Sequence, residues 1–383
     1  MTNDWTDIIR QVHASSRQCV LCATGGGASA IGSLLSVPGG SRSILEAIVP
    51  YAPQALDEWL RRKPDSYCSR ETALSMATAA WARASHLTNA RTNLVGVSCT
   101  ASLASDRPKK GEHRCFVATQ TEDASRCYSL TLLKGARDRA AEESVVANVV
   151  LLAVAEACGV ADRRSLNLTG DEVLEIECEY GPTPIRDVWT GATPLVWSGP
   201  RGELSTERPS RPIALLSGAF NPLHHGHEQL AVAAETRLGG EVAFELPIVN
   251  ADKPRLDYLS IESRRRQFQS RSLAMTSAPL FIDKARLFPR TTFVVGFDTA
   301  ERMLDPRYYG HSEEQMTQSF SELRDLGCRF LVAGRVMHSQ FETLADLAIP
   351  SGLADLFDGL TELEFRDDIS STELRNATPH LCE

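Results

Sequence analysis

Positively charged residues are in the minority in this 383-residue chain. It has 40 Lys and Arg residues and 49 Asp and Glu residues, which gives a formal net charge of −9. An acidic balance argues against a protein that grips nucleic acid through a general basic surface. An anionic ligand would therefore need a local site. The 10 cysteines are too sparse for a secreted disulfide scaffold and indicate reduced thiols in a cytoplasmic protein.

Long apolar runs are also missing. The most apolar stretch, residues 145–160, is interrupted by Asn148 and Glu156, so it predicts a buried helix and not a membrane span. The first residues are polar and acidic, unlike the basic and then apolar start of a secretion signal. With 43% apolar and 23% charged residues, the composition is that of a soluble globular protein large enough for two domains. We therefore expect a cytoplasmic protein that binds neither membrane nor nucleic acid.

Strand and helix patterns predict an α/β protein with two domains joined by an irregular connector. Residues 1–160 contain strand-like runs, a glycine-rich turn and a closing helix over 136–158. Gly-Pro pairs punctuate short strands in residues 161–210, a texture typical of domain boundaries. In residues 211–383 strands alternate with helices, one of them expected over 260–275, and this rhythm predicts a doubly wound parallel sheet.

The most informative stretch is residues 218–227, GAFNPLHHGH, between an expected strand and an expected helix. Ligands bind at the carboxyl edge of a parallel sheet, and a helix N-terminus offers N–H groups to phosphate. Gly218 allows close approach, and His224 and His227 can donate imidazole N–H groups to a polyphosphate and become cationic as charge builds on leaving pyrophosphate. An isolated His-x-x-His pair is more often a surface helix cap, and a zinc site would need further ligands, none of which stands out nearby.

This stretch resembles the GxF[DN]PxHxGH signature of the nucleotidylyltransferase superfamily. Three later stretches agree with that superfamily in the same order: the Asp-Lys-Pro at 252–254, the GFDT at 296–299 and the ISSTELR at 369–375. The GFDT and ISSTELR motifs resemble the forms found in the nicotinamide or nicotinate mononucleotide adenylyltransferases. The resemblance covers nearly all of residues 211–383 and implies a Rossmann-like fold.

The resemblance implies an enzyme that transfers the adenylyl group of ATP to a pyridine mononucleotide, giving NAD or its nicotinate analogue and pyrophosphate. The implied catalytic residues are His224, His227, Lys253 and Arg375. The implied nucleotide-binding residues are Gly218, Ala219, Phe220, Asn221, Gly226, Gly296, Asp298, Ser370, Ser371 and Thr372. Asp298 would accept hydrogen bonds from a ribose, and Lys253 would neutralise phosphate charge between the two substrates. Mg²⁺ would accompany ATP, and no dedicated metal site is expected.

One departure concerns the acceptor. Enzymes of this family usually stack the pyridine ring on a tryptophan, but no tryptophan follows Trp197. Phe288, Phe293 or Tyr258 could supply the aromatic face instead. The acceptor therefore stays open between nicotinamide mononucleotide, its nicotinate analogue and another phosphorylated small molecule. A non-catalytic nucleotide-binding regulator is the alternative of a different class.

Residues 1–160 resemble the CinA C-terminal family, which deamidates nicotinamide mononucleotide, in a Thr-Gly-Gly turn at 24–26, the run 34–41 and a Val-Pro-Tyr triplet. The nucleophilic serine of that family falls on Cys22 and its lysine on Leu56. A thiol needs a base or a positive neighbour to become a thiolate, and a leucine supplies neither. We therefore expect a degenerate domain, kept for homo-oligomer formation or for binding a pyridine nucleotide. Its vestigial site would comprise Cys22, Thr24, Gly25, Gly26 and Tyr51.

Overall fold

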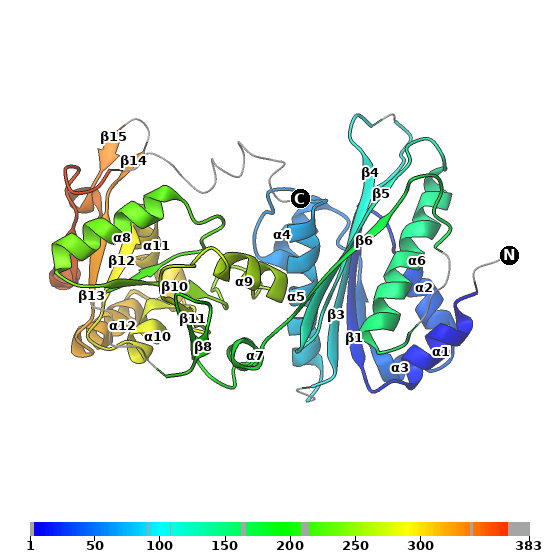
Figure 1. Ribbon diagram of the computed structural model, residues 1–383, viewed down its shortest axis with the longest axis horizontal. Coiled ribbons are helices and arrows are strands. Elements are labelled where there is room, and N and C mark those ends of the chain that lie inside the picture. The colour runs from blue at the N-terminus through cyan, green and yellow to red at the C-terminus, as the bar shows by residue number, and fades with distance from the viewer. Residues whose placement is uncertain are drawn as a thin grey trace. The chain divides into compact units, whose positions relative to one another are not determined.

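The computed structural model describes residues 4–89, 92–107, 109–161, 166–207, 214–337 and 340–366. The chain divides into two compact units: unit 1 comprises Met1–Pro182 and Asp252–Ile261, and unit 2 comprises Thr183–Ala251 and Glu262–Glu383. Each unit is built on one large sheet with helices packed against it (Figure 1). The prediction of two α/β domains is confirmed.

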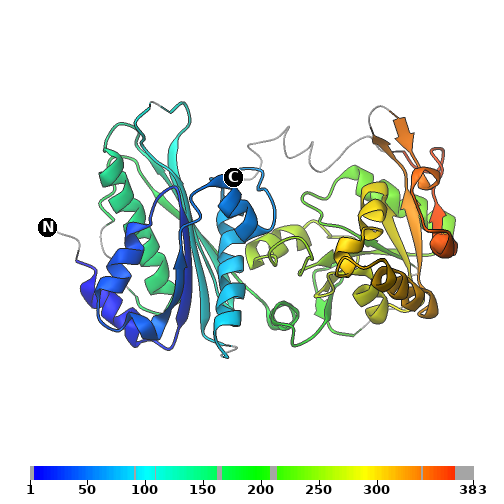
Figure 2. The same ribbon diagram turned by 180° about the vertical axis from the view of Figure 1, so that it is seen from behind.

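Unit 1 contains a mixed sheet of order β2-β1-β3-β4-β5-β6. Its elements are α1 (Thr6–Ala14), β1 (Gln18–Thr24), α2 (Ser29–Ser36), α3 (Gly40–Ser43), β2 (Ile44–Ile48), α4 (Pro53–Leu60), α5 (Arg70–Leu87), β3 (Leu94–Ser102), β4 (His113–Gln120), β5 (Ala124–Leu132), α6 (Arg139–Ala157) and β6 (Leu174–Tyr180). β1 pairs in parallel with β2 and β3, whereas the strands from β3 to β6 pair antiparallel. Helices α1, α2 and α6 cover one face, and α4 and α5 the other, as Figure 2 shows from behind.

Local signals explain the two long helices of unit 1. Ser69 accepts a hydrogen bond from the backbone of the first turn of α5, and Asp138 does the same for α6, which satisfies N–H groups that a helix start leaves without partners. α5 packs closely on β3 because Gly96 has no side chain: a Cβ there would lie 2.0 Å from the carbonyl oxygen of Ala77. Within the described residues, no helix has the length and apolar character needed to cross a membrane.

Unit 2 contains a sheet of order β16-β13-β12-β9-β10-β11-β7-β8. Its elements are α7 (Thr183–Thr190), β7 (Leu195–Ser198), β8 (Leu204–Ser205), β9 (Ala214–Ser217), α8 (His225–Leu238), β10 (Val242–Pro247), α9 (Tyr258–Arg265, which begins in unit 1), β11 (Leu273–Thr276), α10 (Phe281–Leu287), β12 (Thr292–Gly296), α11 (Phe297–Met303), α12 (Glu313–Asp325), β13 (Arg329–Ala333), β14 (Arg335–Met337), β15 (Gln340–Glu342) and β16 (Phe357–Gly359). Neighbours from β16 to β11 pair in parallel, and β7 joins β11 and β8 antiparallel. The doubly wound parallel sheet is confirmed.

The strand order of unit 2 reverses between β9 and β12. From β9 the chain adds β10 and then β11 on one side, and it returns to the other side of β9 for β12, β13 and β16. Helix α8 covers one face, and α10 and α12 cover the other (Figures 1 and 2). In open α/β sheets ligands bind outside the carboxyl ends of the strands at such a reversal. The loops that follow β9 and β12 are therefore the first place to look for a site.

Two stretches differ from what the sequence predicts. The described part of residues 161–210, expected as an irregular connector, is divided between the two units: β6 extends the sheet of unit 1, and α7, β7 and β8 belong to unit 2, with the boundary after Pro182. The helix expected over 260–275 ends at Arg265, and β11 follows as a buried strand. The polar run 269–272 separates them, so the apolar residues after it form a strand of their own.

Candidate nucleotide site

The two motif-bearing loops of unit 2 leave neighbouring strands at the same edge. Leu216 of β9 lies opposite Val294 of β12 in a parallel pair. Residues 218–227 follow β9, and residues 296–298 follow β12. A Cβ placed on Gly296 would meet no atom within 4 Å, so there is open space in front of this turn. The strand reversal thus brings together two of the predicted motifs.

The turn after β9 is held by side chains from distant parts of unit 2. Phe220 has a left-handed backbone with φ of 46°, and its buried ring packs edge-on against Phe244 and Phe268. Gln267 accepts the backbone N–H of Leu223 over 2.7 Å and donates its amide to the carbonyl of Phe220 over 3.3 Å. Sequence reasoning missed Gln267, because an isolated amide 44 residues from its partner belongs to no motif.

The ring of His227 is fixed in one tautomer. The backbone N–H of His224, the residue before α8, donates to Nδ1 of His227 over 3.3 Å, so the ring proton sits on Nε2. The two imidazole centroids lie 3.9 Å apart, and the ring of Phe220 packs edge-on against His227. Burial, and secondarily His224, lowers the pKa of His227 from 6.5 to about 4. At neutral pH His227 is therefore a neutral donor through Nε2.

Asp298 and Ser217 carry polar atoms that suit a hydroxyl-bearing ligand. Asp298 lies in the first turn of α11, and its Oδ2 is ion-paired with Arg335 of β14. Its buried Oδ1 has no hydrogen-bond partner within the described residues, and the same holds there for the buried hydroxyl of Ser217 at the end of β9. Buried polar atoms are nearly always hydrogen-bonded. A carboxylate oxygen and a hydroxyl at the ends of neighbouring strands are therefore candidates to bind a ligand hydroxyl.

The remaining predicted residues of this half fall into three groups. Gly218, Ala219, Asn221 and Gly226 lie in or beside the turn after β9, with Phe220. Lys253 is exposed, and its segment belongs to unit 1 instead of the sheet of unit 2. The residues of the last motif, Ser370, Ser371, Thr372 and Arg375, lie outside the described residues.

None of the three rings expected to stack on a pyridine has a free face. Phe288 and Phe293 are buried in the core of unit 2, where Phe288 also packs edge-on against Trp197. Tyr258 is buried in unit 1. These three rings pack inside hydrophobic cores, so they contribute to core packing and do not offer a face to a pyridine ring.

A buried ion pair supports the start of the turn. Nζ of Lys284 lies 2.7 Å from Oε2 of Glu245, and the hydroxyl of Thr276 donates to Oε1 of Glu245 over 2.5 Å. The carbonyl of Glu245 accepts the backbone N–H of Gly218 over 3.0 Å. The ion pair occupies Lys284, and the backbone hydrogen bond joins β10 to Gly218, the first residue of the motif. Among the described residues, no group of three or more His, Cys, Asp or Glu residues is arranged to hold a metal ion.

The expected vestigial site of unit 1 has a sequestered thiol. Cys22 is 1% exposed and lies in a cluster with Leu56, Leu60 and Met76. Burial raises the pKa of this thiol far above its ordinary value, so the thiolate needed for nucleophilic attack does not form at neutral pH. Tyr51, by contrast, is 70% exposed.

The glycine-rich turn of unit 1 is occupied by a carboxylate of its own chain. The backbone N–H groups of Gly27 and Ser29 donate to Glu143 of α6 over 2.9 and 3.0 Å. Burial opposes ionisation of Glu143, but these backbone bonds and the guanidinium of Arg139 outweigh it and lower the pKa of the carboxyl. Next to this turn, Thr24 donates its hydroxyl to the carbonyl of Pro50. The N–H groups of Gly27 and Ser29 are therefore already satisfied by Glu143.

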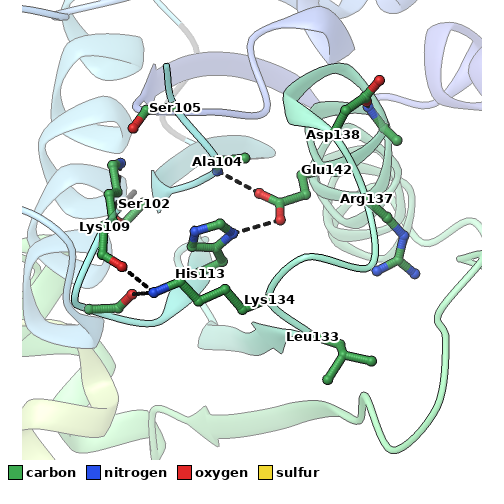
Figure 3. Close-up of polar contacts among 12 residues, drawn as sticks. Ser102, Ala104, Ser105, Lys109, His113, Leu133, Lys134, Arg137, Asp138 and Glu142 are labelled. Atoms are coloured by element: carbon green, nitrogen blue, oxygen red, sulfur yellow. Dashed lines mark hydrogen bonds and ion pairs between the residues drawn. The ribbon is translucent and has the colours of Figure 1, made fainter. Parts of the chain in front are cut away.

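The neighbouring glutamate on α6 forms a second buried contact (Figure 3). Oε1 of Glu142 lies 2.7 Å from Nδ1 of His113, and its Oε2 accepts the backbone N–H of Ala104 over 2.7 Å. Figure 3 shows the carboxylate between the imidazole and the backbone. Adjacent glutamates at the start of α6 thus fasten two loops at the same edge of the sheet, which is a structural role.

No family model matches this chain. Over 133 residues it is 32% identical to a Schizosaccharomyces pombe protein described as "Putative nicotinamide mononucleotide adenylyltransferase", in an alignment that covers 31% of this chain and 53% of that protein. The chain therefore spans about half the length of the curated relative that it matches.

Structural neighbours include a competence/damage inducible protein, CihA, from Agrobacterium tumefaciens (20% identity, 40% of this chain, 91% of that chain, TM-score 0.30). A CinA superfamily protein from Escherichia coli (17% identity, 41% and 88%, TM-score 0.29) and a competence or damage-inducible protein from Enterobacter asburiae (12% identity, 40% and 96%, TM-score 0.32) are others. The chain is thus similar in sequence to a protein described as a nicotinamide mononucleotide adenylyltransferase and has CinA-superfamily proteins among its structural neighbours, the two families that its motifs resemble.

Proposed function

We propose that unit 2 transfers the adenylyl group of ATP to nicotinamide or nicotinate mononucleotide. The observation that supports this most directly is the placement of the His-x-Gly-His turn and the Gly-Phe-Asp turn on neighbouring strands at the strand reversal. In the reaction, a phosphate oxygen of the mononucleotide attacks the α-phosphorus of ATP in line. A new P–O bond forms, the bond to the β-phosphate bridging oxygen breaks, and pyrophosphate leaves.

The protein's part in such a reaction is positioning and charge stabilisation. His227 would donate a hydrogen bond from its Nε2–H group to an ATP phosphate oxygen, and His224 would contact the same polyphosphate. Asp298 would accept a ribose hydroxyl. Lys253 would neutralise phosphate charge, and Ser371, Thr372 and Arg375 would contact the β- and γ-phosphates. Mg²⁺ would enter bound to ATP.

The experiment compares two neighbouring histidines. Wild-type protein, His227→Ala and His225→Ala are incubated with ATP, Mg²⁺ and either mononucleotide, and pyrophosphate release is measured. His225 is exposed and lies at the variable position of the motif, so its replacement should leave turnover within about twofold of wild type. Loss of one transition-state hydrogen bond in His227→Ala should lower kcat at least ~100-fold. Normal turnover in His227→Ala would refute the mechanism.

A second candidate function keeps the reaction and changes the acceptor. It is favoured by the burial of Phe288, Phe293 and Tyr258, which leaves the pyridine without the stacking partner that these rings were expected to supply. A panel of phosphorylated acceptors separates the two candidates, because success with another acceptor and failure with both pyridine mononucleotides would select the second. Homo-oligomer formation through unit 1 stays a prediction.

A further inference from the structure

Two cysteines of unit 1 bring their sulfur atoms into contact although they are far apart in the sequence. Sγ of Cys19, near the start of β1, lies 3.9 Å from Sγ of Cys158, the residue that follows α6, and 139 positions separate the two. Both belong to the apolar core of unit 1, where Cys19 is fully buried and Cys158 is 9% exposed. Since an S–S bond is about 2.0 Å long, the sulfurs would have to approach by about 2 Å to form one.

The geometry of β1 separates Cys19 from the neighbouring thiol of Cys22. Side chains of a strand point to alternate faces of the sheet, so residues three apart lie on opposite faces. Cys19 accordingly belongs to the core that includes α6, whereas Cys22 belongs to the cluster with Leu56 and Leu60 of α4. The sulfur partner of Cys19 therefore comes from the end of α6 and not from its own strand.

The surroundings of the pair favour a thiolate on Cys158. A hydrogen bond from the S–H group of Cys19 lowers the pKa of Cys158; burial opposes this, and the hydroxyl of Ser15 and the charge of Arg17 add to the lowering. The same hydrogen bond, together with burial, raises the pKa of Cys19. Arg17 is held in place by Glu122, whose Oε1 lies 2.9 Å from its guanidinium. Cys19 is thus the proton donor of the pair and Cys158 the acceptor.

This arrangement differs from that of the other buried thiols. Cysteines that react with peroxides have a stabilised thiolate, some exposure and often a second thiol beside them. Cys158 has all three features. Burial raises the pKa of the other buried cysteines of unit 1 that the structure describes, which are Cys22, Cys99, Cys115 and Cys127. Those thiols stay protonated and unreactive at neutral pH.

We propose that Cys19 and Cys158 form a reversible disulfide when the protein meets hydrogen peroxide, so that unit 1 carries an oxidation site separate from Cys22. The thiolate of Cys158 attacks a peroxide oxygen, the O–O bond breaks, and the leaving hydroxide is protonated to water, which leaves a sulfenic acid. Sγ of Cys19 then attacks the sulfur of Cys158, the S–O bond breaks, and the oxygen leaves as a second water with the thiol proton. Two thiols lose two electrons, and the peroxide is reduced to two waters. A dithiol reductant reverses the reaction by thiol–disulfide exchange.

The disulfide ties the start of β1 to the end of α6, at the opposite end of this helix from Glu142 and Glu143. A cross-link that closes so long a loop removes conformational freedom mainly from the unfolded chain, and it therefore stabilises the fold. The thermal unfolding midpoint of unit 1 should rise by about 5–10 °C on oxidation.

The experiment treats the native protein near neutral pH with an about tenfold excess of hydrogen peroxide. Non-reducing tryptic maps should show one linked pair of peptides, one with Cys158 and one with Cys19, and dithiothreitol should separate them. Fragment ions distinguish Cys19 from Cys22, which lies on the same peptide. Cys158→Ser should lose both the link and the rise in midpoint, and Cys19→Ala should stop at a sulfenic acid that dimedone labels at Cys158. Cys178→Ser is the matched control: this thiol is exposed on β6, and its removal should change neither readout.

Oxidation of Cys178 in wild type without a link between Cys19 and Cys158 would overturn the proposal, because it would show that peroxide reached the protein and the pair did not respond. A link that forms in urea but not in the native protein would overturn it too, since the native geometry would then not be what joins the sulfurs. Both readouts are independent of pyrophosphate release, so failure of the proposed adenylyl transfer leaves them unchanged.

Discussion

Burial makes Cys22 a poor nucleophile, and its contrast with Cys178 can be measured. Cys22 is buried in an apolar cluster, whereas Cys178 is exposed on the edge strand β6. In the native protein at pH 8, iodoacetamide should alkylate Cys178 at least ~100-fold faster than Cys22, because the thiolate is the reacting form. Peptide mapping after timed quenching gives both rates, and denaturation in urea should make them equal. Comparable native rates would restore Cys22 as a candidate nucleophile.

His227 should make stability depend on pH between about 6.5 and 4. Its pKa is 6.5 in the reference state and about 4 in the folded protein, so within this window the unfolded chain binds more protons and stability falls as pH falls. From pH 7 to pH 4.5 wild type should lose about 2 kcal/mol more than His227→Gln. Urea unfolding at both pH values measures this, with His225→Gln as the control. Equal losses in wild type and His227→Gln would contradict the pKa.

The sequence predicted those parts of the candidate site whose functional residues lie close together in the chain. The turn after β9 and the Gly-Phe-Asp turn carry their own glycines and side chains, so spacing alone locates them. The sequence did not single out Gln267 or Ser217. Gln267 matters because of a hydrogen-bond partner far along the chain, and Ser217 because its hydroxyl is buried. The burial of Phe288 and Phe293 could not be predicted for the same reason. From the sequence alone, an aromatic residue in a strand or at a helix end that contacts a ligand cannot be distinguished from one that packs in a core.

At the scale of elements, the ion pair between β10 and α10 should be costly to break. Glu245 and Lys284 are both buried, so Lys284→Met leaves a carboxylate without its counter-charge and should lower the free energy of unfolding by about 3–5 kcal/mol. The double variant Glu245→Leu/Lys284→Met should be more stable than Lys284→Met alone, because it removes the unpaired charge as well. Urea unfolding gives these values.

An exposed pair supplies the comparison. Arg324 of α12 lies 2.6 Å from Asp355, with both side chains more than a third exposed, and Arg324→Met should lower the free energy of unfolding far less than Lys284→Met does. Similar costs for Arg324→Met and Lys284→Met would show that burial does not set the strength of the Glu245–Lys284 pair.

The order of strands and helices could be predicted from the sequence, but the compact unit to which each of them belongs could not. Alternating apolar strands and amphipathic helices gave the doubly wound sheet, because periodicity reports which face of an element is buried. Periodicity does not report which core buries it. The segment at 252–261 therefore belongs to unit 1 against the order of the sequence, and β6, which the sequence placed in the connector, extends the sheet of unit 1. Contacts between residues far apart in the sequence, such as those of Tyr258 with Glu122 and of β6 with β5, decide that membership.

On the scale of the whole molecule, two glycine-bearing turns compete as the nucleotide site. Both follow a parallel strand and precede a helix, one after β1 and one after β9. At the first turn Glu143 already accepts the N–H groups of Gly27 and Ser29. Near the second, a Cβ placed on Gly296, at the end of the neighbouring strand β12, would meet no atom within 4 Å. An anionic ligand would have to displace the Glu143 carboxylate at the first turn.

Hydrogen exchange with and without Mg²⁺-ATP distinguishes these turns within one chain. At saturating nucleotide, amides of residues 218–227 and 296–298 should exchange at least ~10-fold more slowly, because a bound ligand raises the free energy of local opening. Residues 24–29 should not change, since Glu143 already accepts the N–H groups of Gly27 and Ser29 in this turn. His227→Ala should abolish the protection and His225→Ala should keep it. Protection confined to residues 24–29 would move the nucleotide site to unit 1 and leave the histidine turn as a helix cap.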